Sequence, residues 1–367
     1  MGGGCTFIRL LAEEDKGVAL TDAVDALQNG EGSSAVFSID PAKFSMVPGS
    51  PFAYWVSDRI RRLFVDLPPF EGDGRTAKAG LCSGDDFRFV RAWWEVDPAR
   101  TVTGTAETTP DEFRAQTCAG KKWVPFAKGG EYSPYYADVH LVVNWERDGE
   151  EIRKGACDRS LPGARPQNTD YYFRPGLTWS LRTQLGFNMR QFPAGAIFGH
   201  KGPVASGNGD NLAVYLSISN SIVFSSLLSL QMAFGSYEVG VIQRTPLPPI
   251  SQPAYRELES LTLQIVDLKR HIDRNDETTR PFVLPSMVTP NRNRTLTEYV
   301  SLFNTEISKV SVDAGEIQHQ IDTIAFDLYG INDKDRKAIE EAFCDRPAPI
   351  NAPPTAPPAL TADLLSY

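Results

Sequence analysis

The residues best placed to do chemistry lie in the stretch 80–95, where glycines and small polar residues come just before two arginines. Glycines on both sides of a polar triplet let backbone N–H groups approach a partner closely, and Arg88 and Arg91 add fixed positive charge. These features suit contact with phosphate groups. The alternation of Phe87 and Phe89 with Arg88 predicts that the loop leads into a strand. A hairpin with solvated arginines would show the same pattern, so the residues alone leave both interpretations open.

Two catalytic interpretations of nearby residues have weaker support. Residues 80–84 match the Gly-x-nucleophile-x-Gly elbow, with Cys82 as nucleophile and His140 or His200 as base. That elbow requires a strand before the nucleophile and a helix after it, whereas a strand is predicted to follow here. A nuclease-like set could be drawn from a charged run in a predicted hairpin turn, which contains Asp148, Glu150, Glu151 and Lys154. Such a run is usually solvated, so we predict no catalytic residues in this chain.

Cofactor and metal motifs are missing from the sequence. A methyltransferase core needs a Gly-rich loop for S-adenosylmethionine and an Asn/Asp-Pro-Pro-Tyr/Phe turn, but residues 67–70 read Leu-Pro-Pro-Phe. No phosphate-binding Gly-x-x-x-x-Gly-Lys-Ser/Thr loop occurs. The cysteines and histidines have no metal-ligand spacing. We therefore predict no cofactor and no metal in this chain, with five free thiols.

Composition predicts a soluble globular protein. Hydrophobic residues make up 41% of the 367 positions and charged residues 23%, and no apolar run is long enough to span a membrane. The N-terminus lacks a secretory pattern, so we expect a cytoplasmic protein without membrane contact. The net charge of −9 is unusual for a nucleic-acid binder. The segment 152–201, however, holds eight Lys or Arg against two Asp, which a polyanion could use.

In the N-terminal part, residues 1–70, the sequence predicts short strands and helices. Strands are expected near 7–11 and 36–39, and a helix is expected over 15–27. A second helix is predicted over 52–64 and should stop before the prolines at 68 and 69. Its outer side should carry Arg59, Arg61 and Arg62.

The middle part, residues 71–250, has the pattern of a β-rich unit with long loops. Strand-like alternation occurs at 87–96, 139–145 and 211–218. Two loops rich in aromatic residues and arginine are predicted at 121–136 and 165–178, and long ordered loops are often functional. An apolar, serine-rich run at 219–230 predicts a buried helix.

The last part predicts helices. Apolar residues recur with alternating spacings of three and four over 258–272 and 300–328, as in a coiled coil. A loop at 281–290 should fold the two helices into an antiparallel hairpin, and Gly330 and Asn332 predict a helix end and a new start. Residues 344–367 are rich in Pro and Ala and are expected to be disordered. The fold class is therefore α+β, a β-rich domain followed by an antiparallel helical hairpin.

Several segments, in order, resemble the C-terminal half of a known enzyme family. They are residues 47–57, 80–91, 128–131, 142–146, 174–179, 234–248 and 321–330. The family is PglX, the large adenine-specific DNA methyltransferases of the BREX phage-exclusion systems, which are relatives of fused restriction-methylation enzymes. The resemblance covers roughly residues 35–343.

The resemblance implies a division of labour along the chain. Residues 71–250 would be a target recognition domain and 251–343 a helical spacer, while 1–70 would lead from a catalytic domain. The chain is expected to begin after that domain, which would bind S-adenosylmethionine, and to be inert alone. The family pattern Thr-Gly-Asp-Asn reads Ser-Gly-Asp-Asp here, so a carboxylate replaces an amide at Asp86. The extra negative charge argues against direct phosphate contact by Asp86.

A recognition domain must both hold phosphates and read base edges. The predicted phosphate contacts are cations and loop residues, namely Arg75, Lys78, Ser83, Gly84, Arg88, Arg91, Lys121, Lys122, Lys128, Arg165 and Arg174. Amides suit adenine and arginine suits guanine, so the predicted base readers are Gln167, Asn168, Asn188 and Arg190. The tyrosines at 135, 136, 171 and 172 and Trp179 would line the loops or fill the core.

The resulting hypothesis is a DNA sequence-recognition module of a site-specific adenine N6 methyltransferase in phage defence. Its partners would be double-stranded DNA, a catalytic methyltransferase domain or subunit, and other defence proteins. The alternative is a protein-interaction or decoy module that binds methyltransferase or defence subunits rather than DNA. The acidic net charge and the Pro-rich tail fit that alternative.

Overall fold

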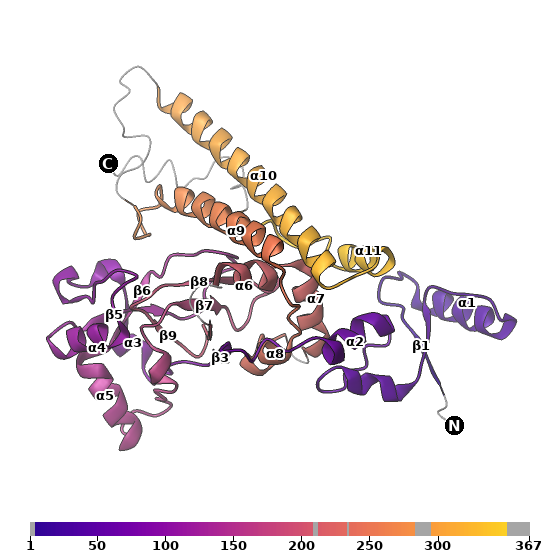
Figure 1. The fold of residues 1–367 in the computed structure, drawn as a ribbon, viewed down its shortest axis with the longest axis horizontal. Helices are drawn as coiled ribbons and strands as arrows, with labels where there is room; N and C mark the ends of the chain where they lie inside the picture. The colour runs from indigo at the N-terminus through magenta and orange to yellow at the C-terminus, as the bar shows by residue number, and fades with distance from the viewer. Residues whose placement is uncertain (1–3, 208–211, 233–234, 283–294, 351–367) are drawn as a thin grey trace.

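The computed structural model describes residues 4–207, 212–232, 235–282 and 295–350. Figure 1 shows an elongated molecule with α1 at one end, the short helices α3 to α5 at the other, and two long helices, α9 and α10, beside the centre. Helices and strands are mixed along the chain, which confirms the α+β class. Residues 283–290 of the predicted connecting loop, and 351–367 of the predicted tail, lie outside the described residues.

The N-terminal unit is a small hairpin with helices. Strand β1 (Cys5–Ile8) pairs antiparallel with β2 (Val36–Ile39), and α1 (Lys16–Asn29) connects them. A 3₁₀ helix, η1 (Pro41–Met46), precedes α2 (Asp58–Asp66). Ser57 caps α2 by accepting a hydrogen bond from Ile60 N, so the helix begins later than predicted, and it ends before the prolines as expected.

One of the three arginines predicted on the outer side of this helix lies inside the protein. Arg61 is only 4% exposed. It donates to the carbonyl of Ala53 at 2.8 Å and to the Asp58 carboxylate at 2.6 Å. The guanidinium therefore ties the preceding loop to the helix instead of facing solvent.

The middle of the chain forms two four-stranded sheets. The first has the order β3-β10-β7-β8, all antiparallel, and contains β3 (Thr76–Lys78), β7 (Gly176–Trp179), β8 (Met189–Phe192) and β10 (Val204–Ser206). The second has the order β4-β6-β5-β9 and contains β4 (Val90–Ala92), β5 (Trp123–Ala127), β6 (Leu141–Asn144) and β9 (Ile197–Phe198). Only β9 joins parallel, alongside β5. The β-rich prediction holds, although β5 occupies part of the predicted loop 121–136.

Helical segments border these sheets. They are α4 (Pro110–Cys118), α5 (Glu146–Cys157), α8 (Val239–Arg244) and the 3₁₀ turns η2 (Trp93–Glu95), η3 (Pro98–Arg100) and η4 (Thr169–Tyr171). The charged run predicted to be a hairpin turn begins with left-handed backbone at Asp148 and Gly149 and then continues as the helical part of α5. The alternating run 211–218 is also not a strand, because its described residues belong to α6 (Leu212–Ser219). This helix is apolar nearly all round, so its pattern carries no clear period.

The predicted strand at 87–96 begins with a helical turn instead. Helix α3 (Asp86–Phe89) is capped by Asp85, which accepts from Arg88 N at 3.0 Å. Residues two apart on a helix point about 200° from each other, whereas on a strand they share a face. Phe87 is accordingly 90% exposed and Phe89 only 1% exposed, so the two do not share a face as predicted.

The helical part follows the spacing of its apolar residues. Helix α9 (Gln252–Asp273) and helix α10 (Leu296–Leu328) lie side by side and run in opposite directions (Figure 1). Fully buried positions along the pair include Leu258, Ile265, Ala314 and Ile321. Asn332 caps the last helix, α11 (Asp333–Ala342), as predicted. A coiled-coil geometry for the pair remains a prediction.

The hydrophobic core has two parts. One holds Trp145, Tyr172 and Phe198 around the second sheet. The other joins the first sheet to α6, α7 (Ile222–Gln231), α9 and α10, and so includes side chains on both sides of residue 250. The domain limits at 70, 250 and 343 therefore remain predictions.

The start of the predicted disordered tail is packed against the protein. Arg346 donates to the carbonyl of Asn220, and Lys269 Nζ donates to the carbonyl of Pro349 at 3.1 Å. Ile350 is only 6% exposed. Buried hydrogen bonds thus hold residues 346–350, which differs from the disorder expected from their composition.

In the part of the chain that the structure describes, no single helix combines the length and apolar character of a membrane span. Only α6 and α7 taken together, with a 68° bend between them, reach that length and composition.

Candidate nucleic-acid interface

The loop at residue 80 is packed against protein backbone. Leu81 N donates to the carbonyl of Phe198 at 2.9 Å, and Cys82 N donates to the carbonyl of Arg165 at 3.0 Å. A Cβ atom at Gly80 would lie 1.9 Å from the Phe198 carbonyl oxygen, so no larger residue fits. The close approach predicted from the glycine therefore exists, but the partner at this position is strand β9 instead of a phosphate.

An internal ion pair occupies the polar side of this loop. Ser83 is buried and its hydroxyl donates to Asp86 Oδ1 at 2.6 Å, while the Lys128 ammonium pairs with the same carboxylate. Burial acts to raise the pKa of Asp86, but hydrogen bonds from Lys128 and Ser83 outweigh it and leave that pKa below its ordinary value. Two predicted phosphate contacts, Ser83 and Lys128, are thus already engaged by an anion of the protein.

Other predicted cations are also paired with carboxylates. Arg88 pairs with Glu151 on α5, and Lys78 Nζ lies 4.0 Å from Glu71. The side chain of Arg75 is only 9% exposed and pairs with Asp73 at 3.1 Å. Arg75 also donates to the Phe70 carbonyl at 3.0 Å and lies over the Tyr215 ring. These contacts give Arg75 a structural role, and phosphate contact by this residue remains a prediction.

Tyr171 is the centre of a more open cationic cluster. The Lys78 ammonium and the Arg174 guanidinium each lie 5.7 Å from the centre of its ring. Gln167 Nε2 donates to the Gly80 carbonyl at 2.9 Å, and Asn168 Nδ2 donates to the Ala79 carbonyl at 2.8 Å. These bonds bring the first part of the predicted loop 165–178 directly against the end of β3. Five predicted site residues therefore meet here, namely Lys78, Arg165, Gln167, Asn168 and Arg174.

Two predicted lysines lie elsewhere. Lys121 and Lys122 precede β5, whereas Lys128 follows it. A five-residue strand is about 17 Å long, so the two groups lie at opposite ends of the strand. Lys121 Nζ donates to the Ala99 carbonyl at 2.6 Å, and Lys122 lies over the Trp123 ring.

Two predicted base readers are buried. Arg190 is 4% exposed and donates to the Glu131 carbonyl at 3.0 Å and to Ser180 Oγ at 2.7 Å. Burial lowers the pKa of Arg190 to about 10. Asn188 is 1% exposed, and its amide oxygen accepts from Ser133 N. Both side chains are thus largely covered, although Arg190 lines the groove described below. A base-reading role for either residue remains a prediction.

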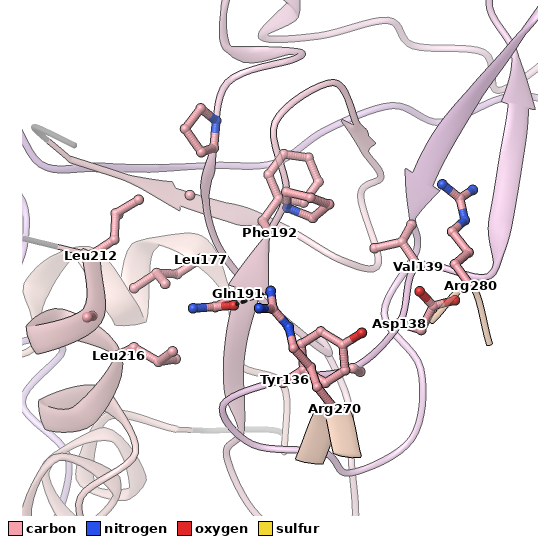
Figure 2. Close-up of a pocket in the computed structure, with 15 residues that line it drawn as sticks. Tyr136, Asp138, Val139, Leu177, Gln191, Phe192, Leu212, Leu216, Arg270 and Arg280 are labelled. Atoms are coloured by element: carbon pink, nitrogen blue, oxygen red, sulfur yellow. Dashed lines mark hydrogen bonds between the residues drawn. The ribbon is translucent and has the colours of Figure 1, made fainter. Parts of the chain in front are cut away.

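A groove between the first sheet and α9 was not predicted. It consists of two adjoining pockets of about 390 and 490 Å³ that share Ala137, Asp138, Val139 and Gln191. Figure 2 shows Arg270 directed at Gln191, to which it donates at 3.3 Å. Burial and the nearby Asp138 raise the pKa of Asp273 to about 6.

This groove gave no sequence signal because its walls come from four distant segments, at 126–141, 175–193, 212–216 and 270–280. Titratable side chains gather there, but no group of three His, Cys, Asp or Glu suited to a metal ion occurs in the described part of the chain. The groove therefore has mixed apolar and polar walls that carry several charged side chains. The described residues offer no metal-ligand group there.

The fold and this surface define an α+β protein that presents a cationic, aromatic-bearing loop cluster next to a charged groove. No protein-family model matches the sequence. The chain is 26% identical over 304 residues to the adenine-specific methyltransferase PglX of Lacticaseibacillus casei, a match that covers 82% of this chain and 24% of the relative. It is 32% identical over 208 residues to the adenine-specific methyltransferase BrxX of Escherichia coli, which covers 56% of this chain and 15% of the relative.

The chain is thus related to the PglX family of adenine-specific methyltransferases, which confirms the resemblance predicted from its segments. It spans about a quarter or less of the length of these curated relatives. A target-recognition role for the matched part remains a prediction.

Proposed function

We propose that this chain is the DNA sequence-recognition module of a site-specific adenine N6 DNA methyltransferase in a phage-defence system of the BREX or restriction-modification type. The observation that carries the proposal is the similarity to PglX over 82% of the chain. Methyl transfer from S-adenosylmethionine would then require a catalytic domain or subunit that works together with this chain.

The loop cluster supports a DNA-facing role because it combines the two kinds of group that such a surface needs. Arg165 and Arg174 are exposed and have no carboxylate partner among the ion pairs of the described residues. Asn168 is also exposed. Guanidinium groups hold phosphates, and amides suit adenine edges. Gly84 on the adjoining loop, Arg88 on α3 and Arg91 on β4 would extend the same surface.

A titration against duplex DNA tests the proposal. Phosphate contacts release counterions, so binding should weaken steeply between low and moderate salt. We expect measurable binding in low salt, a linear dependence of log affinity on log salt, and a shallower slope for Arg174→Ala. Absence of binding at every salt concentration would exclude a stand-alone DNA-binding role.

A methylation assay tests the proposed division of labour. The chain alone should transfer no methyl group, and activity should appear when a PglX-type catalytic subunit is added. Transfer by the chain alone would contradict the proposal.

A second candidate function is a protein-interaction or decoy module that binds methyltransferase or defence subunits. The observation that favours it is the pairing of predicted DNA contacts with the protein's own carboxylates, as in Lys128–Asp86 and Arg88–Glu151. Capture of a methyltransferase subunit by the chain after nuclease treatment, together with no duplex binding, would favour this function over DNA recognition.

A further inference from the structure

Phe87 is the most exposed large apolar side chain of the described protein, at 90%. It is also the one large apolar residue of α3 and β4 that faces solvent, because Phe89 is 1% exposed and packs in the core of the second sheet. A lone protruding aromatic ring differs from the broad apolar patch expected of a stable protein interface.

The backbone beneath this ring is held from several sides. Arg91 donates to the carbonyl of Phe87, and its guanidinium lies 5.8 Å from the centre of the ring. Asp85 caps the same turn through Arg88 N, and the neighbouring Asp86 is fixed by Ser83 and Lys128. The ring therefore projects from a rigid, pre-ordered turn, which lowers the entropy lost on binding.

The surroundings of the ring favour a nucleic-acid partner. Arg91 lies beside it, Arg88 follows it in the chain, and the loop that precedes it adjoins the segment carrying Arg165. Of the nearby carboxylates, Asp85 caps α3, Asp86 pairs with Lys128, and Glu151 pairs with Arg88. Arg91 is therefore the cation beside the ring that has no carboxylate partner among the ion pairs of the described residues. Side chains such as Phe that stand among cations can enter between base pairs and unstack one step of the duplex.

We propose that Phe87 acts as a wedge that inserts between base pairs when this surface binds duplex DNA. This inference rests on the proposed function, because it requires that the chain bind DNA. The wedge would make the protein sensitive to how easily a base step opens, in addition to the base edges that it reads.

The experiment compares two duplexes of the same mixed sequence, one intact and one with a single abasic site that weakens stacking at one step. A 2-aminopurine base beside the abasic site reports insertion, because stacking on an aromatic ring changes its fluorescence. Each stacking contact changes affinity by roughly 5- to 160-fold. We therefore expect the full chain to bind the abasic duplex about 10-fold more tightly than the intact one.

Substitutions at the exposed residues Phe87 and Val65 should leave the fold intact, so they distinguish loss of the wedge from loss of structure. Phe87→Ala should bind both duplexes alike and lose the fluorescence change, while Phe87→Trp should keep both effects. Val65→Ala is the matched control, since Val65 is 64% exposed on α2, far from α3 in Figure 1. Full preference for the abasic duplex in Phe87→Ala would overturn the wedge.

Two further results have distinct meanings. If the unaltered chain binds DNA but does not distinguish the duplexes, the wedge is wrong and the proposed function stands. If it binds neither duplex in low salt, the proposed function fails. Loss of capture of a methyltransferase subunit by Phe87→Ala, with DNA binding unchanged, would identify the ring as a protein anchor and overturn the inference.

Discussion

Replacing Asp86 with asparagine should tighten DNA binding. The Asp86 carboxylate now holds the Lys128 ammonium and accepts from the Ser83 hydroxyl. Asparagine has nearly the same shape, and its amide oxygen can still accept from Ser83. The substitution therefore removes one negative charge from the surface and frees one lysine for phosphate, with little change to the loop.

The magnitude follows from the exposure of the pair. The side chains of Lys128 and Asp86 are 22% and 52% exposed, so water screens the ion pair and its strength is about 1 kcal/mol at most. That energy corresponds to about a 5-fold tighter dissociation constant. One additional phosphate contact also steepens the slope of log affinity against log salt by about 0.9.

The assay is fluorescence anisotropy of a labelled duplex over a series of salt concentrations. Asp111→Asn is the matched control, because Asp111 is 92% exposed and pairs with Arg114 on α4. Hydrogen bonds hold the pKa of Asp86 below 3.8 against the opposing effect of burial, so the unaltered protein should show no gain in affinity on mild acidification. Equal affinity and equal slope for Asp86→Asn and the unaltered chain would refute the reasoning.

Three further predictions concern stability and binding. Burial raises the pKa of Asp273 from 3.8 to about 6, so the protein is most stable below about pH 4, where Asp273 is protonated, and loses this stability as pH rises through 6. Asp273→Asn should therefore be about 3 kcal/mol more stable than the unaltered protein above pH 6 by urea unfolding, and no more stable near pH 3. Gly80→Ala should cost about 3 kcal/mol or more, because its Cβ would meet the Phe198 carbonyl, whereas Gly32→Ala, with open space around it, should change stability little. Arg174→Ala should weaken DNA binding uniformly across sequences and reduce the salt slope by about 1, and a sequence-dependent loss would instead make Arg174 a base reader.

The two long helices, α9 and α10, could be predicted from the sequence because their apolar spacing repeats over many turns. Apolar residues at alternating spacings of three and four fix one buried stripe, and the buried Leu258 and Ile321 lie on it. Polar caps such as Asn332 marked where helices start. Both signals depend only on residues close together in the sequence, and the apolar spacing recurs over many turns of each helix.

Short elements could not be predicted in the same way. Four residues at α3 contain too few positions to separate a helical from an alternating pattern, and the side-chain bond from Asp85 decided the matter. The fully apolar α6 gave no usable period either.

Burial of charged residues was also beyond the sequence. Arg174 and Arg190 look alike along the chain, yet Arg174 is exposed beside the half-buried ring of Tyr171, and Arg190 is enclosed by Ser180 and Glu131. The difference comes from strand pairing between distant segments. For the same reason, the groove beside Arg270 was not anticipated.

Selection from a pool of randomised duplexes is the most direct test of the central claim. The full chain would be incubated with the pool at low salt, and the bound duplexes would be sequenced over successive rounds. A recognition module should enrich one short adenine-containing sequence, and the enrichment should weaken when the exposed Asn168 is replaced by alanine. Bound duplexes with no common sequence, or no bound duplex at all, would contradict the claim that this chain recognises a DNA sequence.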